Sequence, residues 1–190
     1  ETFVFHGNSA WGTLALACAT HPKLSHKTSG LILNCSAWLS ENFGVDVTKS
    51  LFTLIKNAKD PVMIKPVIET LVQFPKEDIP DWLVQEIQWI VIGDGLKERL
   101  EKIIHRWQVF KKDAHALREF FINGLDRFKQ ENKPVLILGG KYDTVTPPNV
   151  IHEMASKLDA EATFFDTGHV PHIQAYEKFN KSVEQFLWKL

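Results

Sequence analysis

Hydrophobic residues form short β-rich runs near the start of the chain. The stretches "TFVF" (2–5) and "SGLILNCSAW" (29–38) favour strands, and "GTLALACATHP" (12–22) between them favours a buried helix that ends at Pro22. A strand, a helix and a second strand joined by short connections are typical of a parallel sheet. This part of the chain therefore predicts a βαβ unit.

The pattern of alternating strands and helices returns near the C-terminus. Two strands and two helices are predicted there, in the order strand, helix, strand, helix: "KPVLILGG" (133–140), "VIHEMASKL" (150–158), "AEATFFD" (160–166) and "AYEKFNKSVEQFLWKL" (175–190). We therefore predict an α/β fold whose mainly parallel sheet is built from residues 1–38 and 129–190. The segment between them predicts an insertion into that fold.

Residues 39–128 contain amphipathic helical patterns and no comparable strand pattern. Asp60-Pro61 and Pro80-Asp81 predict helix starts, and Asp113 can cap a third helix. One face of that helix carries apolar residues at helical spacing: Leu117, Phe120, Phe121, Leu125 and Phe128. The tryptophans of this region are interpreted as packing residues, with an apolar substrate cavity as the alternative: Trp82, Trp89 and Trp107. We predict a helical cap, or lid, over this range.

Charge and composition narrow the choice of partner. The formal net charge is −1 and charges of both signs are interspersed, so the sequence does not indicate an electrostatic field that would attract nucleic acid or an anionic membrane. A neutral small molecule is the expected partner, and the oligomeric state is left open. No apolar run reaches the length of about 20 residues that spans a membrane. The chain begins at Glu1, directly on a strand, so we expect the fold to be N-terminally incomplete.

The cysteines and histidines give little support to a metal site. Cys18 and Cys35 lie in apolar surroundings without metal-ligand spacing, so we interpret them as reduced thiols of a cytoplasmic enzyme. Three histidines lie in segments with a helical pattern and lack paired carboxylates: His105, His115 and His152. No glycine-rich phosphate loop follows a strand. We therefore expect neither a metal nor a cofactor.

Candidate chemistry begins at "FVFHGNSAWG" (3–12), where a strand gives way to a helix. A serine hydroxyl becomes an effective nucleophile when it is exposed on a tight turn beside a base, with backbone N–H groups facing the developing oxyanion. Ser9 occupies such a turn, and the N–H of Ala10 at the helix start would face the oxyanion. An ordinary serine in a turn is the alternative interpretation.

Two further residues follow the C-terminal strands. Asp143 lies in the loop after one strand and His169 lies just past the next. Because the carboxyl ends of parallel strands meet at one edge of a sheet, both would share that edge with Ser9. His169 would then take the proton of Ser9, and Asp143 would orient the imidazole. Taken singly, Asp143 could be a turn residue and His169 structural, and His172 is interpreted as a pocket or surface residue.

These stretches together resemble the α/β-hydrolases with a helical cap. "GNSAWGTLALACATHP" is similar to that family's nucleophile elbow and helix, "KPVLILGGKYDTVTPP" to its acid-bearing strand, and "FDTGHVPHIQAYEKFN" to its histidine loop. Within the family, the layout resembles single-domain carboxylesterases such as the pimeloyl-carrier-protein methyl ester esterases. The resemblance implies a Ser-His-Asp triad of Ser9, His169 and Asp143.

The elbow departs from the family pattern G-x-S-x-G. Gly7 is present, but Trp11 occupies the position two residues after Ser9, and the next glycine is Gly12. An alternative register places Ala10 at the nucleophile position, but it requires a deletion inside the helix. We therefore prefer a single substitution of glycine by Trp11.

The sequence thus predicts a serine hydrolase that cleaves carboxylic esters with an apolar moiety through an acyl-enzyme. Four residues are expected to contact the substrate: Trp11, Trp38, Val145 and Val170. Other acyl-transfer chemistry of the same triad, in a peptidase or a lactonase, is an alternative. So is a catalytically silent fragment or non-enzymatic relative, because of Trp11 and the missing upstream strands.

Overall fold

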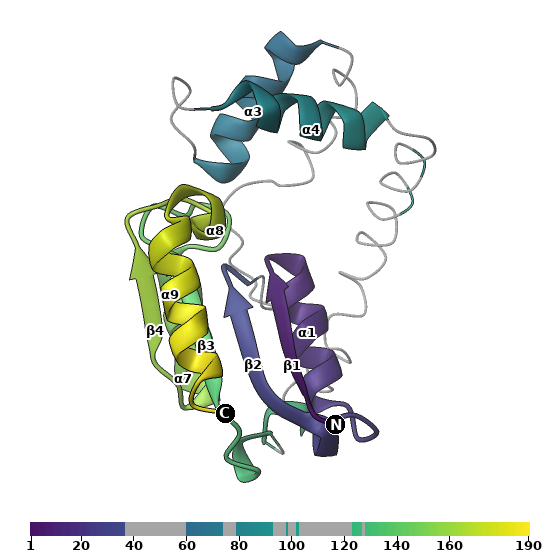
Figure 1. Ribbon diagram of the computed structural model, residues 1–190, viewed down its shortest axis with the longest axis vertical. Helices are drawn as coiled ribbons and strands as arrows, with labels where there is room; N and C mark the ends of the chain where they lie inside the picture. The colour runs from purple at the N-terminus through teal and green to yellow at the C-terminus, as the bar shows by residue number, and fades with distance from the viewer. Residues whose placement is uncertain (37–59, 74–78, 93–97, 99–101, 103–122, 127) are drawn as a thin grey trace. The chain divides into compact units, whose positions relative to one another are not determined.

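The computed structural model describes residues 1–36, 60–73, 79–92, 98, 102, 123–126 and 128–190. The chain divides into two compact units. The first consists of Glu1–Gly44 together with Ala116–Leu190, and the second of Val45–His115. Figure 1 gives the elements of both units.

A parallel sheet forms the centre of the first unit. Its strands are β1 (Phe3–Asn8), β2 (Thr28–Asn34), β3 (Val135–Gly140) and β4 (Ala162–Phe165). They lie in the order β1-β2-β3-β4 and every neighbouring pair is parallel. The α/β fold expected from the sequence is confirmed, and all strands end at the same edge.

Helices connect and cover these strands. They are α1 (Ala10–Thr20), the short 3-10 helix η1 (Ser25–Lys27), α7 (Pro148–Leu158), α8 (Pro171–Gln174) and α9 (Tyr176–Leu187). Helix α1 joins β1 to β2, and α7 joins β3 to β4. The four-residue α8 was not expected from the sequence. It begins at Pro171 and places one turn between the β4 loop and α9.

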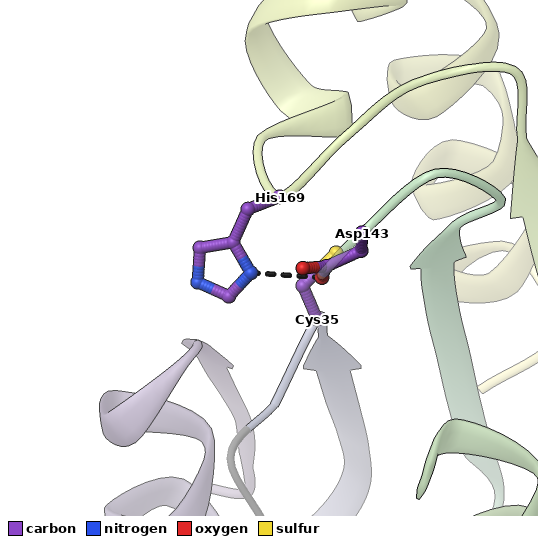
Figure 2. Close-up of side chains that lie close together, drawn as sticks. All are labelled: Cys35, Asp143 and His169. Atoms are coloured by element: carbon purple, nitrogen blue, oxygen red, sulfur yellow. Dashed lines mark hydrogen bonds and ion pairs between the residues drawn. The ribbon is translucent and has the colours of Figure 1, made fainter. Parts of the chain in front are cut away.

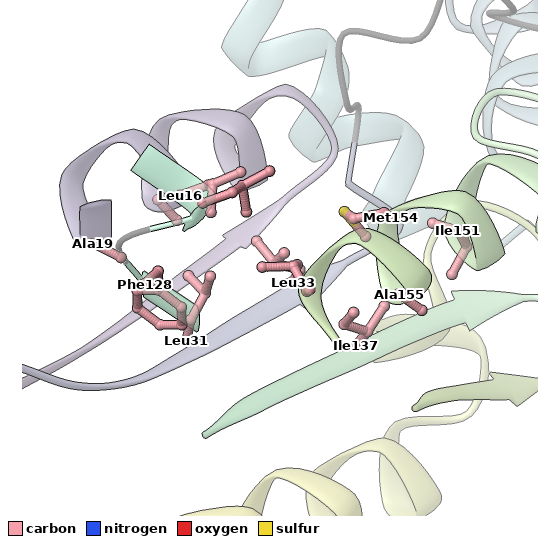
Figure 3. Packing of buried hydrophobic residues seen from close by; sticks show 12 residues of the cluster. Leu16, Ala19, Leu31, Leu33, Phe128, Ile137, Ile151, Met154 and Ala155 are labelled. Atoms are coloured by element: carbon pink, nitrogen blue, oxygen red, sulfur yellow. The ribbon is translucent and has the colours of Figure 1, made fainter. Parts of the chain in front are cut away.

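The sheet is buried on both faces, and this explains the unbroken apolar run in β2. Leu31 and Leu33 pack with α1 and α7 on one face, whereas Ile32, between them, packs with Phe179 and Phe186 of α9. Successive side chains of a strand point to opposite faces, so a strand covered on both sides is apolar throughout. Figure 3 shows the first of these two clusters.

Two residues that the sequence analysis assigned to the insertion pack instead in that cluster. Leu125 and Phe128 are 4% and 2% exposed, and they lie among the α1, β2 and α7 side chains. Burying an apolar side chain of this size contributes about 1.5–3 kcal/mol to folding. These residues therefore belong energetically to the core of the sheet.

The second unit contains α3 (Pro61–Val72) and α4 (Asp81–Ile92), which confirms the two predicted helix starts. The Oδ1 atom of Asp60 accepts a hydrogen bond from the Val62 N–H at 3.0 Å, as an N-cap should. The helices pack through aliphatic side chains: Ile64, Val67, Ile68, Ile79, Leu83 and Val84. By contrast, Trp82 and Trp89 are 58% and 73% exposed, so they do not supply this packing.

The helix start at Asp113 and the apolar residues Leu117, Phe120 and Phe121 lie outside the described residues, as does Trp107. Among the residues that the structure describes, none of the helices has the length and apolar character needed to cross a bilayer.

Candidate functional site

Chemically active side chains follow every strand of the sheet. Ser9 comes directly after β1, Cys35 after β2, Asp143 after β3 and His169 after β4. Because the strands are parallel neighbours, these positions lie along one edge, where α/β proteins bind ligands. The edge therefore forms the candidate active site.

Ser9 occupies a sharply turned, strained backbone between β1 and α1. Its φ of 54° and ψ of −128° lie in a region that residues with a side chain rarely adopt, at a cost of about 1–3 kcal/mol. The turn is held on both sides, because the Ser9 N–H donates to the Asn34 carbonyl at 3.0 Å and the Gly12 N–H donates to the Ser9 carbonyl at 3.0 Å. Strain of this kind is typical of a nucleophile held on a strand-to-helix turn.

Glycines permit the close approaches of backbone and side-chain atoms around this turn. A Cβ atom on Gly7 would lie 2.3 Å from the Trp11 carbonyl oxygen, and one on Gly12 would lie 1.8 Å from the Ser36 Oγ. The side chain of Trp11, in contrast, is 70% exposed. The turn therefore requires glycine at 7 and 12, while position 11 has room for an indole that points to solvent.

The N–H of Ala10 is the first of helix α1. The first N–H groups of an α-helix have no partner within the helix, and they carry the positive end of its dipole. Ala10 follows Ser9 directly and is exposed. Ala10 thus lies at the start of α1, next to Ser9, where the sequence predicted the oxyanion donor.

Asp143 and His169 form a hydrogen-bonded pair. The Nδ1 atom of His169 lies 2.8 Å from Oδ2 of Asp143, and the opposite edge of the imidazole, which carries Nε2, points away from the carboxylate (Figure 2). Both residues are buried, at 8% and 2% exposure. This is the arrangement by which a carboxylate fixes the tautomer of a catalytic imidazole.

Asp143 is satisfied by several donors besides His169. Its Oδ1 accepts the N–H groups of Val145 at 2.8 Å and Thr146 at 3.0 Å, and its Oδ2 accepts the Thr146 hydroxyl at 2.6 Å. Burial by itself would raise the pKa of Asp143, but the hydrogen bonds from His169 and Thr146 outweigh it and hold the pKa below its ordinary value. The carboxylate therefore stays ionised at neutral pH.

The β3 and β4 loops meet closely behind this pair. A Cβ atom on Gly140, the last residue of β3, would lie 2.0 Å from the Gly168 carbonyl oxygen, so only glycine fits there. The N–H of Gly168 donates to Oε1 of Gln174 at 3.0 Å, which ties the histidine loop to α8. These contacts position His169 against Asp143.

Thr146 and Cys35 belong to the same cluster. Thr146 was not among the residues predicted from the sequence, and Cys35 was interpreted only as a reduced thiol, without a place beside Asp143. Besides its bond to Asp143, the Thr146 hydroxyl lies 3.2 Å from the Cys35 carbonyl and 3.4 Å from Nδ1 of His169. The Cys35 thiol is fully buried, and burial together with the nearby Asp143 carboxylate raises its pKa. The spacing D-x-x-T from Asp143 to Thr146 was an available clue to a turn that caps the carboxylate.

A second polar pair, Asn34 and His172, lies beside the cluster. Nδ2 of Asn34 is 3.0 Å from Nδ1 of His172, and the buried Oδ1 of Asn34 has no hydrogen-bond partner among the described residues. Burial lowers the pKa of His172, and the neighbouring His6 and His169 lower it further. His172 is therefore a neutral, half-buried imidazole rather than a free surface group.

The remaining predicted contact residues have different surroundings. Val145 and Val170 are buried, at 4% and 8% exposure, and each lies within two residues of a member of the Asp143–His169 pair. Trp38 lies outside the described residues. Cys18, in α1, is free and half-buried.

Comparison with known proteins shows the fold. No protein-family model matches the sequence. No curated protein matches it either. Many solved structures do, and the fold they share is the α/β-hydrolase fold.

Three of these structures illustrate the likeness. A protein from Acinetobacter baumannii AYE described as a lipase is 21% identical over 99% of this chain and 61% of its own, with a TM-score of 0.78. A meta-cleavage product hydrolase from Pseudomonas fluorescens IP01 is 20% identical over 100% of this chain and 65% of its own, with a TM-score of 0.74. An enol-lactonase from Burkholderia xenovorans LB400 is 16% identical over 98% and 65%, with a TM-score of 0.66. The chain thus spans somewhat less than two thirds of the length of the structures it matches.

Proposed function

Starting from the α/β-hydrolase fold of this chain, we propose that the protein is a serine hydrolase of carboxylic esters. The observation that carries the proposal is the buried hydrogen bond of 2.8 Å between His169 Nδ1 and Asp143 Oδ2, at the sheet edge that also holds the strained Ser9. A nucleophile, a base and a group that orients the base are the parts that acyl transfer requires.

In this mechanism, His169 Nε2 takes the proton of Ser9 as its Oγ attacks the ester carbonyl. Asp143 accepts the Nδ1–H and stabilises the imidazolium that forms. The Ala10 N–H donates to the oxyanion of the tetrahedral intermediate, an interaction worth about 10²–10³ in rate for a well-placed donor. His169 then returns the proton to the leaving alcohol, and the acyl group remains on Ser9.

The second half of the reaction uses the same groups. A water molecule attacks the acyl carbonyl while His169 Nε2 takes its proton, and collapse of the intermediate releases the acid and restores the Ser9 hydroxyl. Protons and electrons balance with the three side chains, one ester and one water molecule, and the Ala10 N–H keeps its proton throughout. The low pKa of Asp143 supports this cycle, because the carboxylate must remain ionised throughout.

Substrate selection is part of the proposal. We assign apolar contacts with the substrate to Trp11, Val145 and Val170. Trp11 lies two residues after Ser9 in the sequence and is 70% exposed. The second unit, Val45–His115, which falls within the insertion expected from the sequence, is proposed as the cap that selects the acyl or alcohol group, and Trp38 is proposed to contact the substrate. A panel of p-nitrophenyl esters, lactones and peptides of graded size distinguishes an esterase from the other acyl-transfer enzymes.

Hydrolysis of short-chain p-nitrophenyl esters tests the proposal. Ser9→Ala, His169→Gln and Asp143→Asn should each lower kcat by about 10⁴ or more, since triad members act as a unit. Circular dichroism checks that each variant remains folded, and Ser182→Ala, at a half-buried serine on α9, is the matched control. Retained turnover in Ser9→Ala would refute the assignment of the nucleophile.

A further inference from the structure

Cys35 is held rigidly against the Asp143–His169 pair. Its backbone has a φ of 42°, its N–H donates to the Leu138 carbonyl at 2.8 Å, and its carbonyl oxygen lies 3.2 Å from the Thr146 hydroxyl. One ligand atom from each of Cys35, Asp143 and His169 lies within 4.8 Å of the others (Figure 2). The hydrolysis proposed above gives the thiol no part to play.

The three side chains offer a thiolate, a carboxylate and an imidazole, which are the ligands that zinc prefers. Zinc bonds of about 2.0–2.3 Å place tetrahedral ligand atoms about 3.3–3.7 Å apart. On binding, the 2.8 Å contact between His169 Nδ1 and Asp143 Oδ2 would therefore open by about 0.5 Å, and the distances from the Cys35 sulfur, which are at most 4.8 Å, would close by at most about 1.5 Å. The charges also suit a buried site. One divalent cation, one thiolate, one carboxylate and a neutral imidazole sum to zero.

We propose that Cys35, Asp143 and His169 form a binding site for one soft divalent cation, zinc or cadmium, which switches the Asp143–His169 pair off. On binding, the cation replaces the thiol proton of Cys35, which leaves to solvent, and takes Nδ1 of His169, whose proton moves to Nε2. One proton is released per cation, and nothing is oxidised or reduced. The imidazole keeps 10% of its side-chain surface exposed while the Asp143 side chain has none, so we expect the cation to enter past His169.

This arrangement has a direct consequence for catalysis. An imidazole with the cation on Nδ1 and a proton on Nε2 cannot accept the proton of Ser9, so the bound form is inactive. Cation binding itself does not depend on the proposed hydrolysis, whereas the inhibition does. The two are therefore measured separately.

Binding is read from the ultraviolet charge-transfer absorption of a cadmium–thiolate bond during titration with cadmium chloride. We expect a band that saturates at one cadmium per chain, with one proton released. Cys35→Ala should abolish the band, and Cys35→Ser, which retains the size of the side chain, should do the same. Cys18→Ala is the matched control, because Cys18 is the other free cysteine and is not in a metal-ligating group among the described residues.

Inhibition is read from ester hydrolysis with and without zinc, each variant being normalised to its own rate without cation. The parent and Cys18→Ala should lose at least 90% of their rate at saturating zinc, about 1.4 kcal/mol in barrier, and should recover it when a chelator is added. Cys35→Ala and Cys35→Ser should require at least tenfold more zinc for the same loss.

A cadmium band that persists in both Cys35 variants, or that disappears in Cys18→Ala, would overturn the site. A band that saturates normally while zinc leaves hydrolysis unchanged would overturn the switch. If the protein hydrolyses no ester at all, the proposed function fails, but the cadmium titration still decides whether the cation site exists.

Discussion

Replacing Ser9 by glycine should stabilise the protein while abolishing its activity. Ser9 has a φ of 54° and a ψ of −128°, a conformation that costs a residue with a Cβ atom about 1–3 kcal/mol and costs glycine little. Glycine also adds conformational entropy to the unfolded chain, and this lowers the stability of the fold by about 0.5–1 kcal/mol. The difference predicts that Ser9→Gly is about 1 kcal/mol more stable than Ser9→Ala.

Ser9→Ala is the reference, because alanine keeps the Cβ atom and removes only the hydroxyl. Urea unfolding followed by circular dichroism gives the free energy of unfolding of both variants, and thermal unfolding should show Ser9→Gly higher by about 2–4 °C. In ordinary helix or strand backbone, glycine is less stable than alanine by about 0.5–1 kcal/mol. A Ser9→Gly variant that is less stable than Ser9→Ala would therefore refute the strained turn.

Three further predictions concern the Ser9 turn, Asp143 and His172. Gly7→Ala should lower the free energy of unfolding, measured in urea, by about 1–3 kcal/mol, because the new Cβ meets the Trp11 carbonyl oxygen at 2.3 Å. Trp11→Ala, at a 70% exposed side chain, should change it by less than about 0.5 kcal/mol. Equal losses of stability in the two variants would contradict the close approach at Gly7. Thr146→Val removes the 2.6 Å hydrogen bond to Asp143 and should cost about 1–3 kcal/mol at pH 7. Because the low pKa of Asp143 stabilises the fold only while the carboxyl is ionised, that difference should shrink as the pH falls below about 4, and a difference independent of pH would count against it. The pKa of His172 is lowered in the fold, so the unfolded chain binds more protons below about pH 6.5, and the free energy of unfolding should fall from pH 7.5 to 5.5. His172→Gln should lose less stability over that range. An unchanged pH dependence in this variant would argue against a neutral, half-buried imidazole.

Much of the first unit could be predicted from the sequence, because its information is local. Apolar runs bounded by glycine and proline located the strands, and the parallel order brought Ser9, Asp143 and His169 to one edge. The helix starts at Asp60-Pro61 and Pro80-Asp81 were equally local, since a cap is decided by a few neighbouring residues.

What the sequence missed depends on contacts between distant segments. Cys35 and Thr146 are far apart in the chain, and only the pairing of β2 with β3 brings them together around Asp143. The need for glycine at position 12 arises from Ser36, which follows a different strand. Likewise, the helical spacing around Phe128 predicted an apolar face without telling which layer that face covers.

The proposed hydrolysis requires Ser9 to be a nucleophile activated by His169 and Asp143. Labelling with a fluorophosphonate probe, followed by peptide mass spectrometry, tests it most directly, because the probe reacts with activated serines of this type. We expect one adduct per chain, located on Ser9, absent in Ser9→Ala and strongly slowed in His169→Gln. A folded protein that takes up no probe, or that carries the adduct on another serine, would contradict it.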